Sequence, residues 1–234
     1  QYGLEVVMKN RTNLSSMADV EAFEGRRPLQ EFCGGNTYDI IQNSAKMYSN
    51  RAAIKLISSS ASDREISVVT YQELLEKITQ SANLFYPWLD GAESVVSCVL
   101  PSLPQTHYAI WGAEASGIAG PINQYLSAEA IRDIMITSAT EVLVTLGPNL
   151  DYDIWEKICS IADQVPTLKV IYQVNLVGAN PGASLLVPKG IPFHDFDQAL
   201  SAQSSASLSF ERVIDGSDLA ALFHTDGTTG MPKL

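Results

Sequence analysis

The chain has 234 residues, with 15 Lys plus Arg against 26 Asp plus Glu, so its formal net charge is −11 at pH 7. Hydrophobic residues make up 46% and charged residues 18%, which excludes a mainly disordered chain and supplies enough apolar material for a large core. The acidic balance argues against nucleic acid as a partner, because phosphate backbones select clustered Lys and Arg.

No stretch of the sequence reaches the roughly 20 consecutive apolar residues of a membrane-spanning helix. The strongly apolar run at 94–100 ends at Pro101. The first residues lack the basic start and apolar run of a signal peptide. Cys33, Cys98 and Cys159 are odd in number and widely spaced, which is typical of reduced thiols. We therefore expect a cytoplasmic protein without a transmembrane segment.

Helical and extended patterns alternate along the chain after an irregular stretch that ends near Asn36. The expected elements are a helix at 40–48, strands at 52–57 and 65–69, a helix from 71 that Pro87 kinks or closes, a strand at 94–100, a helix at 104–116, a strand at 118–122, a helix at 128–137, a strand at 141–146, a helix at 152–162, a strand at 168–174, a short helix at 195–200 and a strand at 219–224. Strands separated by helices of this length predict crossover units and a parallel sheet.

Local signals fix several of these boundaries. Thr70 and Glu73, three residues apart, form a capping box that opens a helix with an apolar face of period 3.6. Gly117 is expected to end the helix that follows Pro104. Ser127 is expected to cap the helix at 128–137. A Gly-, Asn- and Pro-rich surface loop at 174–189 and a Ser-rich connector at 203–207 complete the pattern.

The last residues place a loop of small and hydroxyl-bearing residues after an apolar strand. From residue 223 the order is Phe-His-Thr-Asp-Gly-Thr-Thr-Gly-Met-Pro-Lys-Leu. Glycines let backbone N–H groups approach an anion, hydroxyls add donors, and lysine adds a mobile positive charge. The candidate nucleotide-binding residues are Thr225, Asp226, Gly227, Thr228, Thr229, Gly230 and Lys233. The loop is therefore a candidate cradle for a triphosphate.

The loop differs from the common P-loop, Gly-x-x-x-x-Gly-Lys-Ser/Thr. Two residues, one of them Pro232, separate Gly230 from Lys233. A nucleotide kinase or GTPase of that class is therefore disfavoured. Taken alone, Gly-Thr-Thr-Gly favours a hairpin turn with an exposed lysine by a wide margin, so a phosphate-binding interpretation depends on the residues around it.

The longer string, Thr-x-Gly-Thr-Thr-Gly-x-Pro-Lys after an apolar strand, resembles the phosphate-binding signature of the adenylate-forming (AMP-binding) enzymes. That superfamily includes acyl-CoA synthetases, peptide-synthetase adenylation domains and luciferases. Weaker matches follow the family's order: Thr-Tyr-x-Glu-Leu at 70–74, a proline-bearing loop at 99–104, a Gly-x-x-x-Pro-Ile-Asn-like strand at 117–123, Leu-Ser-x-Glu-x-Ile at 126–131 and Val-Leu-Val-Thr at 142–145. The Phe-His-Thr form of the loop is most like the fatty-acyl-CoA synthetase branch.

The resemblance implies an α/β fold of layered sheets with flanking helices, as in the N-terminal subdomain of the acyl-CoA synthetase fold. It divides the chain into an N-terminal arm at 1–36, an α/β subdomain at 37–215, and a strand with the phosphate-binding loop at 216–234. It also implies a function, in which a carboxylic acid, expected to be fatty, attacks ATP bound to Mg²⁺. Acyl-AMP and pyrophosphate form, and coenzyme A then takes the acyl group.

Asp226 departs from the family pattern, because Ser, Thr or Gly is usual there. A carboxylate about 5 Å from one phosphate charge is repelled by roughly 3 kcal/mol at an effective dielectric near 20. Three readings remain open for Asp226. It weakens ATP binding, it approaches Mg²⁺, or it faces away as an Asx-type turn residue.

Length is the second departure, because members of this family continue for several hundred residues beyond the loop. Those residues carry the adenine and ribose contacts, a magnesium-binding glutamate, most of the acyl pocket and a domain with a catalytic lysine. We therefore expect an N-terminal fragment with no catalytic residue of its own and no activity alone. The alternatives are a peptide-synthetase or aryl-acid adenylation domain, and a non-catalytic module with a decayed loop.

The three histidines are a weaker signal. His224 precedes the loop, where it either contacts substrate or phosphate or serves as a structural residue at a strand end. His107 and His194 lie far from it in sequence, and a structural role is expected for each. Residues this scattered do not predict a metal site.

Overall fold

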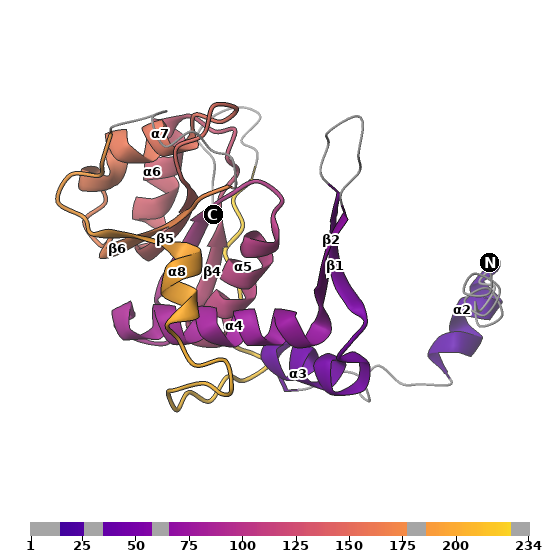
Figure 1. The fold of residues 1–234 in the computed structure, drawn as a ribbon. Coiled ribbons are helices and arrows are strands. Elements are labelled where there is room, and N and C mark those ends of the chain that lie inside the picture. The colour runs from indigo at the N-terminus through magenta and orange to yellow at the C-terminus, as the bar shows by residue number, and fades with distance from the viewer. Residues whose placement is uncertain (1–14, 26–34, 58–65, 177–185, 226–234) are drawn as a thin grey trace.

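The computed structural model describes residues 15–25, 35–57, 66–176 and 186–225. A five-stranded sheet with helices on both faces forms its centre (Figure 1), as the alternating pattern predicts. In their order across the sheet, the strands are β4 (Ile118–Pro121), β3 (Val95–Val99), β5 (Thr140–Leu146), β6 (Val170–Val174) and β7 (Phe193–Asp195). Every neighbouring pair is parallel, so the carboxyl ends of these strands share one edge.

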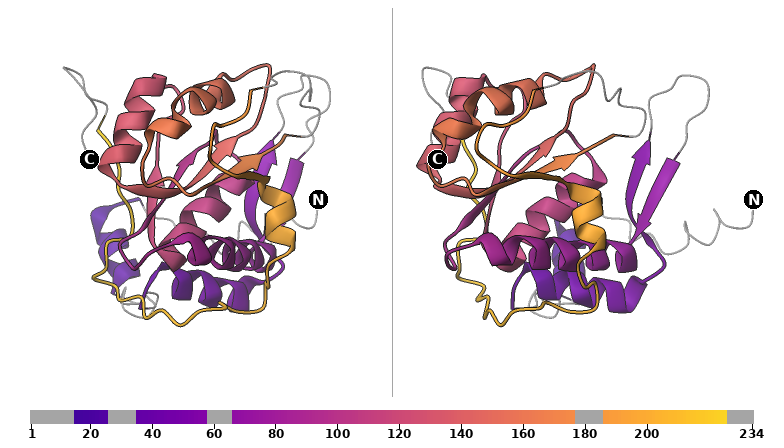
Figure 2. Two further views of the ribbon diagram at one scale, coloured as in Figure 1. Left: turned by 90° about the vertical axis from the view of Figure 1, so that its left-hand side faces the viewer. Right: turned by 60° about the vertical axis from the view of Figure 1, so that its left-hand side comes forward.

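Helices cover the two faces of the sheet as separate layers (Figure 2). One layer contains α4 (Tyr71–Phe85), α5 (Pro104–Ser116) and α8 (Phe196–Ser201), and the other contains α6 (Ala128–Thr137) and α7 (Ile154–Ile161). Short 3₁₀ turns, η2 (Tyr86–Trp88) and η3 (Ala162–Gln164), follow α4 and α7. None of the helices within the described ranges is long and apolar enough to cross a bilayer.

The remaining elements lie outside the sheet. Helix α3 (Thr37–Tyr48) packs against α4 and α5, and a small antiparallel hairpin of β1 (Ala52–Ile57) and β2 (Ile66–Thr70) projects beside them (Figure 1). Helix α2 (Met17–Glu24) buries none of its residues. It is nevertheless a capped helix, whereas the sequence predicts an irregular arm throughout 1–36.

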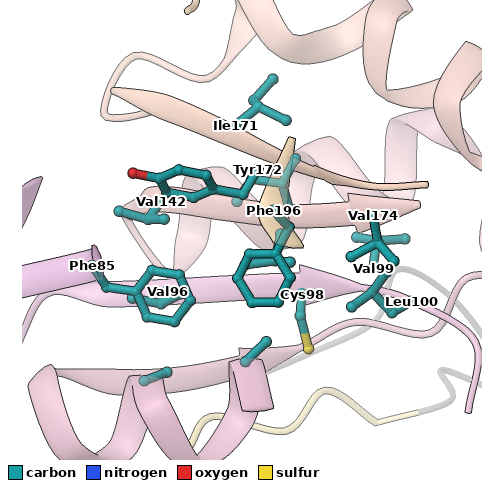
Figure 3. Packing of buried hydrophobic residues seen from close by; sticks show 14 of the residues in the cluster. Phe85, Val96, Cys98, Val99, Leu100, Val142, Ile171, Tyr172, Val174 and Phe196 are labelled. Atoms are coloured by element: carbon teal, nitrogen blue, oxygen red, sulfur yellow. The ribbon is translucent and has the colours of Figure 1, made fainter. Parts of the chain in front are cut away.

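The centre of the sheet is covered on both sides, which explains why its strands are mainly apolar and show little alternation with polar residues. All residues of β3 and β5 are buried. On the α4 side, Phe85 stacks on Phe196 with ring centroids 6.2 Å apart and planes 9° apart. Tyr172 of β6 lies within 6.3 Å of both rings, and Figure 3 shows this aromatic group with Val96 and Cys98.

Two of the predicted helices begin and end for local reasons. The capping box that opens α4 is confirmed, since the Glu73 N–H donates to Thr70 Oγ1 at 3.2 Å and the Thr70 N–H donates to Glu73 Oε2 at 2.8 Å. Gly117 ends α5 as predicted, but not through a left-handed conformation, because its φ is −163°. A Cβ at Gly117 would lie 2.5 Å from the Ser94 carbonyl oxygen, so close approach of the backbone selects glycine there.

Helices α4 and α5 cross closely. A Cβ on Gly112 of α5 would meet the Cβ of Ser81 at a distance that real Cβ atoms do not reach, and would lie 3.1 Å from the backbone nitrogen of Ala82. Ser81 and Ala82 are fully buried in α4. The absence of a side chain at Gly112 therefore sets the spacing between the two helices.

A buried amide fixes the Ser-rich connector that follows α8. Asn83, 2% exposed on α4, donates from Nδ2 to the carbonyl oxygens of Ser204 at 2.9 Å and Ser207 at 3.0 Å. Its Oδ1 accepts from the backbone N–H of Ser209 at 2.7 Å and from the Ser209 hydroxyl at 3.0 Å. The connector is therefore held to the body of the fold by a side chain more than 120 residues earlier in the chain.

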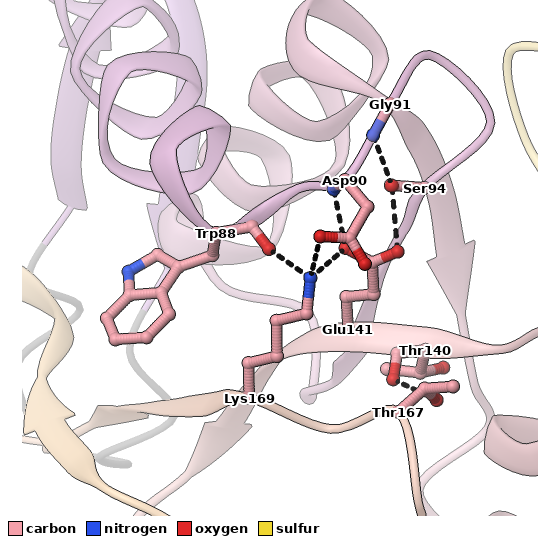
Figure 4. A network of polar contacts seen from close by, with 8 residues as sticks. All are labelled: Trp88, Asp90, Gly91, Ser94, Thr140, Glu141, Thr167 and Lys169. Atoms are coloured by element: carbon pink, nitrogen blue, oxygen red, sulfur yellow. Dashed lines mark hydrogen bonds and ion pairs between the residues drawn. The ribbon is translucent and has the colours of Figure 1, made fainter.

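A polar network fastens the amino-terminal end of the sheet (Figure 4). Glu141, 9% exposed, accepts from the Ser94 hydroxyl at 2.8 Å, the Asp90 N–H at 3.0 Å and Lys169 Nζ at 3.0 Å. Lys169 also donates to the Trp88 carbonyl at 2.9 Å and pairs with Asp90 at 2.6 Å. Burial lowers the pKa of Lys169, but the hydrogen bonds to Asp90 and Glu141 outweigh it and raise that pKa overall.

Two predicted boundaries differ from the structure near the C-terminus. Residues 219–224, predicted as a strand, make a single parallel bridge between Ala221 and Ala119. The sequence also predicts a helix from 195 without the short strand before it, β7, which contributes only three residues to the sheet. Residues 193–195 have no apolar run of their own, whereas residues 219–223 form an apolar run that pairs with β4 at a single position.

Burial of ionisable core groups predicts a loss of stability at alkaline pH. Burial raises the pKa of the Cys98 thiol to about 12, whereas an unfolded thiol titrates near 8.5. Above about pH 9 the unfolded chain releases this proton and the folded chain does not, so the free energy of unfolding should fall by up to about 1.4 kcal/mol per pH unit from this group. Urea titrations between pH 8 and 11 measure this slope.

Cys98→Val provides the comparison for that slope, because it keeps an apolar side chain of similar size without the thiol. The variant should lose less stability between pH 9 and 11 than the parent chain. Equal slopes in the two proteins would mean that Cys98 does not contribute to the alkaline effect.

Candidate functional site

The chain reaches its last described residues alongside β4, at the edge of the sheet. The Ala119 N–H donates to the Ala220 carbonyl at 2.9 Å, and the Leu222 N–H donates to the Ala119 carbonyl at 2.8 Å. Because this bridge is parallel, residues 219–225 run toward the edge where the carboxyl ends of β3 and β4 lie. Ligands of open parallel sheets bind at this edge.

His224 is held at this edge by a backbone contact. Its Nε2 accepts a hydrogen bond from the Asn123 N–H at 3.0 Å. Asn123 lies two residues after the end of β4, and its Oδ1 accepts from the Tyr125 N–H at 3.0 Å. This contact favours the structural interpretation of His224, which fixes the direction in which the chain leaves the sheet at Thr225.

Of the predicted nucleotide-binding residues, the structure describes only Thr225, which is exposed directly after His224. Asp226, Gly227, Thr228, Thr229, Gly230 and Lys233 lie outside the described residues. The structure therefore locates the entry to the predicted loop, at the carboxyl edge of the sheet beside β4, and the roles of the loop residues remain predictions.

A lysine that the sequence analysis did not single out lies near the same edge. Lys157 of α7 donates to the Gln124 carbonyl at 3.4 Å and pairs with Asp153 at 2.9 Å. The hydrogen bond from Lys157 lowers the pKa of Asp153. The i,i+4 spacing of the two residues on a helix was the available sequence signal. Asp153 balances the charge of Lys157, and the hydrogen bond from Lys157 to Gln124 links α7 to the 122–126 loop.

The other histidines do not join this site. His107 of α5 packs against Trp111 with ring centroids 5.2 Å apart, and burial lowers its pKa. His194 of β7 lies beside Tyr172 at 6.1 Å. Within the described parts of the chain, no group of three or more His, Cys, Asp or Glu residues could hold a metal ion. The structural roles predicted for His107 and His194 agree with these contacts.

Comparison with known proteins gives a consistent result. The family model described as AMP-binding enzyme matches residues 41–234. The marinolic acid–CoA ligase of Pseudoalteromonas sp. (strain SANK 73390) is 27% identical over 225 residues, covering 95% of this chain and 32% of that protein. The crotonobetaine/carnitine–CoA ligase of Salmonella typhimurium is 28% identical over 205 residues, covering 86% of this chain and 36% of that protein.

A solved structure supports the same fold. The crystal structure of the anthranilate CoA ligase AuaEII in complex with anthranoyl-AMP aligns with a TM-score of 0.65 at 18% identity, covering 84% of this chain and 33% of that one. At this identity the likeness concerns the fold alone. The chain spans about a third of the length of these matched proteins.

Proposed function

The chain belongs to the AMP-binding enzyme family, whose model matches residues 41–234, and from this premise we propose that it supplies the phosphate-holding, N-terminal part of an ATP-dependent acid–thiol ligase. In the proposed reaction a carboxylate displaces pyrophosphate from ATP to form acyl-AMP, and coenzyme A then takes the acyl group. The single observation that carries the proposal is the family match, because it spans both the sheet and the predicted phosphate loop.

The geometry of the sheet edge supports a role in holding phosphate. The bridge at Ala221 and the contact between Asn123 and His224 fix the chain just before the loop. We propose that Thr225, Gly227, Thr228, Thr229, Gly230 and Lys233 hold the β- and γ-phosphates as pyrophosphate leaves. Donors fixed before the reaction stabilise the developing charge without having to reorganise. We propose that Mg²⁺ enters the site bound to ATP.

The acid is proposed to be a fatty acid. The support is the Phe-His-Thr form of the motif, which resembles the fatty-acyl branch of the family. The matched relatives are named for different acids, so a substrate panel must include aryl and amino acids beside fatty acids. A preference for aryl or amino acids would replace the fatty-acid proposal with the adenylation-domain alternative.

ATP–pyrophosphate exchange tests the proposed reaction. We expect the protein that contains this chain and its downstream residues to catalyse exchange when a fatty acid is supplied, and Lys233→Ala to reduce that exchange at least tenfold. Lys55→Ala, an exposed lysine of β1, is the matched control and should retain full exchange. The 234-residue chain alone should give no exchange above the Lys233→Ala background. Absence of exchange with every acid would contradict the proposal.

Asp226 provides a second prediction, on affinity for ATP. Asp226→Ser and Asp226→Gly should each tighten Mg·ATP binding, because they remove a negative charge from a loop that gathers donors around a polyanion. If half of the estimated repulsion survives solvent screening, about 1.5 kcal/mol, the affinity rises roughly tenfold. Calorimetric titration of Mg·ATP measures the change.

The two alternatives for Asp226 give different titrations. If Asp226 faces away as a turn residue, Asp226→Ser leaves the affinity unchanged and Asp226→Gly costs some stability. If Asp226 helps to hold Mg²⁺, both variants bind more weakly. Unchanged or weaker binding in both variants would reject the repulsion argument.

A further inference from the structure

The backbone pairing between β4 and the chain that leads to the phosphate loop reaches a proline. The Ala119 N–H donates to the Ala220 carbonyl at 2.9 Å, and the Leu222 N–H donates to the Ala119 carbonyl at 2.8 Å. Because alternate residues of a strand direct their backbone groups to the same side, the next donor of β4 toward this chain would come from residue 121. That residue is Pro121, which has no N–H. β4 therefore has no backbone donor of its own for the last step toward Thr225.

The His224 side chain binds the first donor beyond this gap. Its Nε2 accepts from the Asn123 N–H at 3.0 Å, in the place of a backbone carbonyl. Asn123 is itself fixed, because its Oδ1 accepts from the Tyr125 N–H at 3.0 Å and its carbonyl accepts from the Leu126 N–H at 3.2 Å. One imidazole nitrogen therefore ties the residue before Thr225 to a turn that has hydrogen bonds of its own.

This contact defines the protonation state of the ring that holds the chain. A nitrogen that accepts a hydrogen bond carries no proton, so neutral His224 has its proton on Nδ1. Nδ1 lies 3.5 Å from the Thr225 carbonyl oxygen, which is the outer limit of a hydrogen bond. A charged ring carries N–H on both nitrogens, and its Nε2 would then meet the Asn123 N–H as a second donor. The contact therefore exists only while the ring is neutral.

The surroundings of His224 do not hold a proton on the ring. The ion pairs of the described residues do not include His224. β4 has no ionisable side chain, the 122–126 loop has Tyr125, and α7 has Lys157, whose charge Asp153 balances. Asp226 lies outside the described residues. Since the His224 side chain is only half-buried, the ring exchanges protons with solvent.

We propose that His224 is a positioning residue for the phosphate loop. Its neutral ring, with the proton on Nδ1, fixes the chain at the carboxyl edge of the sheet just before Thr225, and protonation of the ring frees this point of the chain. His224 acts through Asn123 and does not touch the nucleotide. The proposal rests on the proposed function, in which Thr225 begins the loop that holds the phosphates of ATP. Because an ordinary histidine changes its charge between about pH 5 and 8, the affinity for Mg·ATP should fall as the pH is lowered through this range.

Nitrogen NMR of the 234-residue chain tests the contact without ATP. At about pH 8 the His224 ring should be the Nδ1–H tautomer, with a scalar coupling across the hydrogen bond from the Asn123 nitrogen to Nε2. At about pH 5 this coupling should disappear, whereas the Leu222 amide, which is bonded to Ala119, should keep its protection against exchange. An Nε2–H tautomer in the neutral ring, or a coupling that persists when the ring is charged, would overturn the proposal. With no nucleotide present, this result is independent of the ligase assay.

Two substitutions at His224 separate positioning from a general structural role. His224→Gln keeps a side-chain acceptor that stays uncharged over this pH range, and His224→Phe keeps a ring without an acceptor. In the longer protein at about pH 8, the loss of one hydrogen bond in His224→Phe should raise KM for Mg·ATP about fivefold, with a smaller effect on kcat. His224→Gln should restore the parent KM.

The pH profile gives the decisive comparison. As the pH falls from about 8 to about 5.5, KM for Mg·ATP should rise about fivefold more in the parent protein than in His224→Gln. His194→Gln, which replaces an exposed histidine of β7, is the matched control and should follow the parent profile. The same pH profile for the parent protein and His224→Gln would overturn the proposal.

Discussion

Gly112→Ala is expected to lower the free energy of unfolding by about 2–3 kcal/mol, even though alanine is the better helix former by about 1 kcal/mol. The new methyl group would overlap Ser81 and crowd the backbone nitrogen of Ala82 at 3.1 Å. Both belong to α4, so the helices must separate and loosen the core that they share. Urea unfolding monitored by circular dichroism measures the loss.

A matched glycine and a double variant separate overpacking from other causes. Gly91 has nothing within 4 Å of an added Cβ, so Gly91→Ala should change stability by less than about 0.5 kcal/mol. Ser81→Gly removes the Cβ atom that the new methyl group of Gly112→Ala would overlap. The double variant should therefore be more stable than the sum of the two single effects predicts. Strict additivity would show that the two positions do not clash.

Glu141→Ala is expected to cost about 3 kcal/mol, because it removes the acceptor of three hydrogen bonds at once, each worth roughly 1 kcal/mol. Ser94 and the backbone of Asp90 lose their acceptor in a largely buried site, and Lys169 loses one of its two carboxylates. The loop before β3 would no longer be tied to β5 and β6. Thermal and urea unfolding both measure the effect.

Asp90→Asn is the control for that network. The Asp90 carboxylate also pairs with Lys169, but its side chain is 82% exposed, and exposed pairs contribute little. The variant should therefore cost less than 1 kcal/mol. Equal losses for Glu141→Ala and Asp90→Asn would show that the charge of Lys169, rather than the buried acceptors, accounts for the network's stability.

The elements that could be predicted from the sequence are those determined by nearby residues. Thr70 and Glu73 mark the start of α4, Pro104 and Gly117 bound α5, and Ser127 caps α6, each within a few residues of the boundary. Residues of β3 and β5 are mainly apolar and show no regular alternation with polar residues, so their place at the centre of a parallel sheet also follows from the sequence.

The features that could not be predicted depend on residues far apart in the chain. Nothing near Asn83 indicates that its amide will bond Ser204, Ser207 and Ser209. The single bridge at Ala221 likewise depends on Ala119, about a hundred residues earlier. For the candidate site, the sequence motif identifies the phosphate loop, whereas the contact that holds His224 beside Asn123 required the fold.

The hydrogen bonds between Asn83 and the Ser-rich connector have a consequence for the order in which the chain folds during synthesis. Its partners are made 121 to 126 residues later, which takes roughly 6–25 seconds at about 5–20 residues per second. Until Ser209 leaves the ribosome, water must form part of the hydrogen bonding of the Asn83 amide, and that side of α4 stays hydrated. The α4–α8 side of the domain should therefore become resistant to protease later than the α6–α7 side in a translation time course.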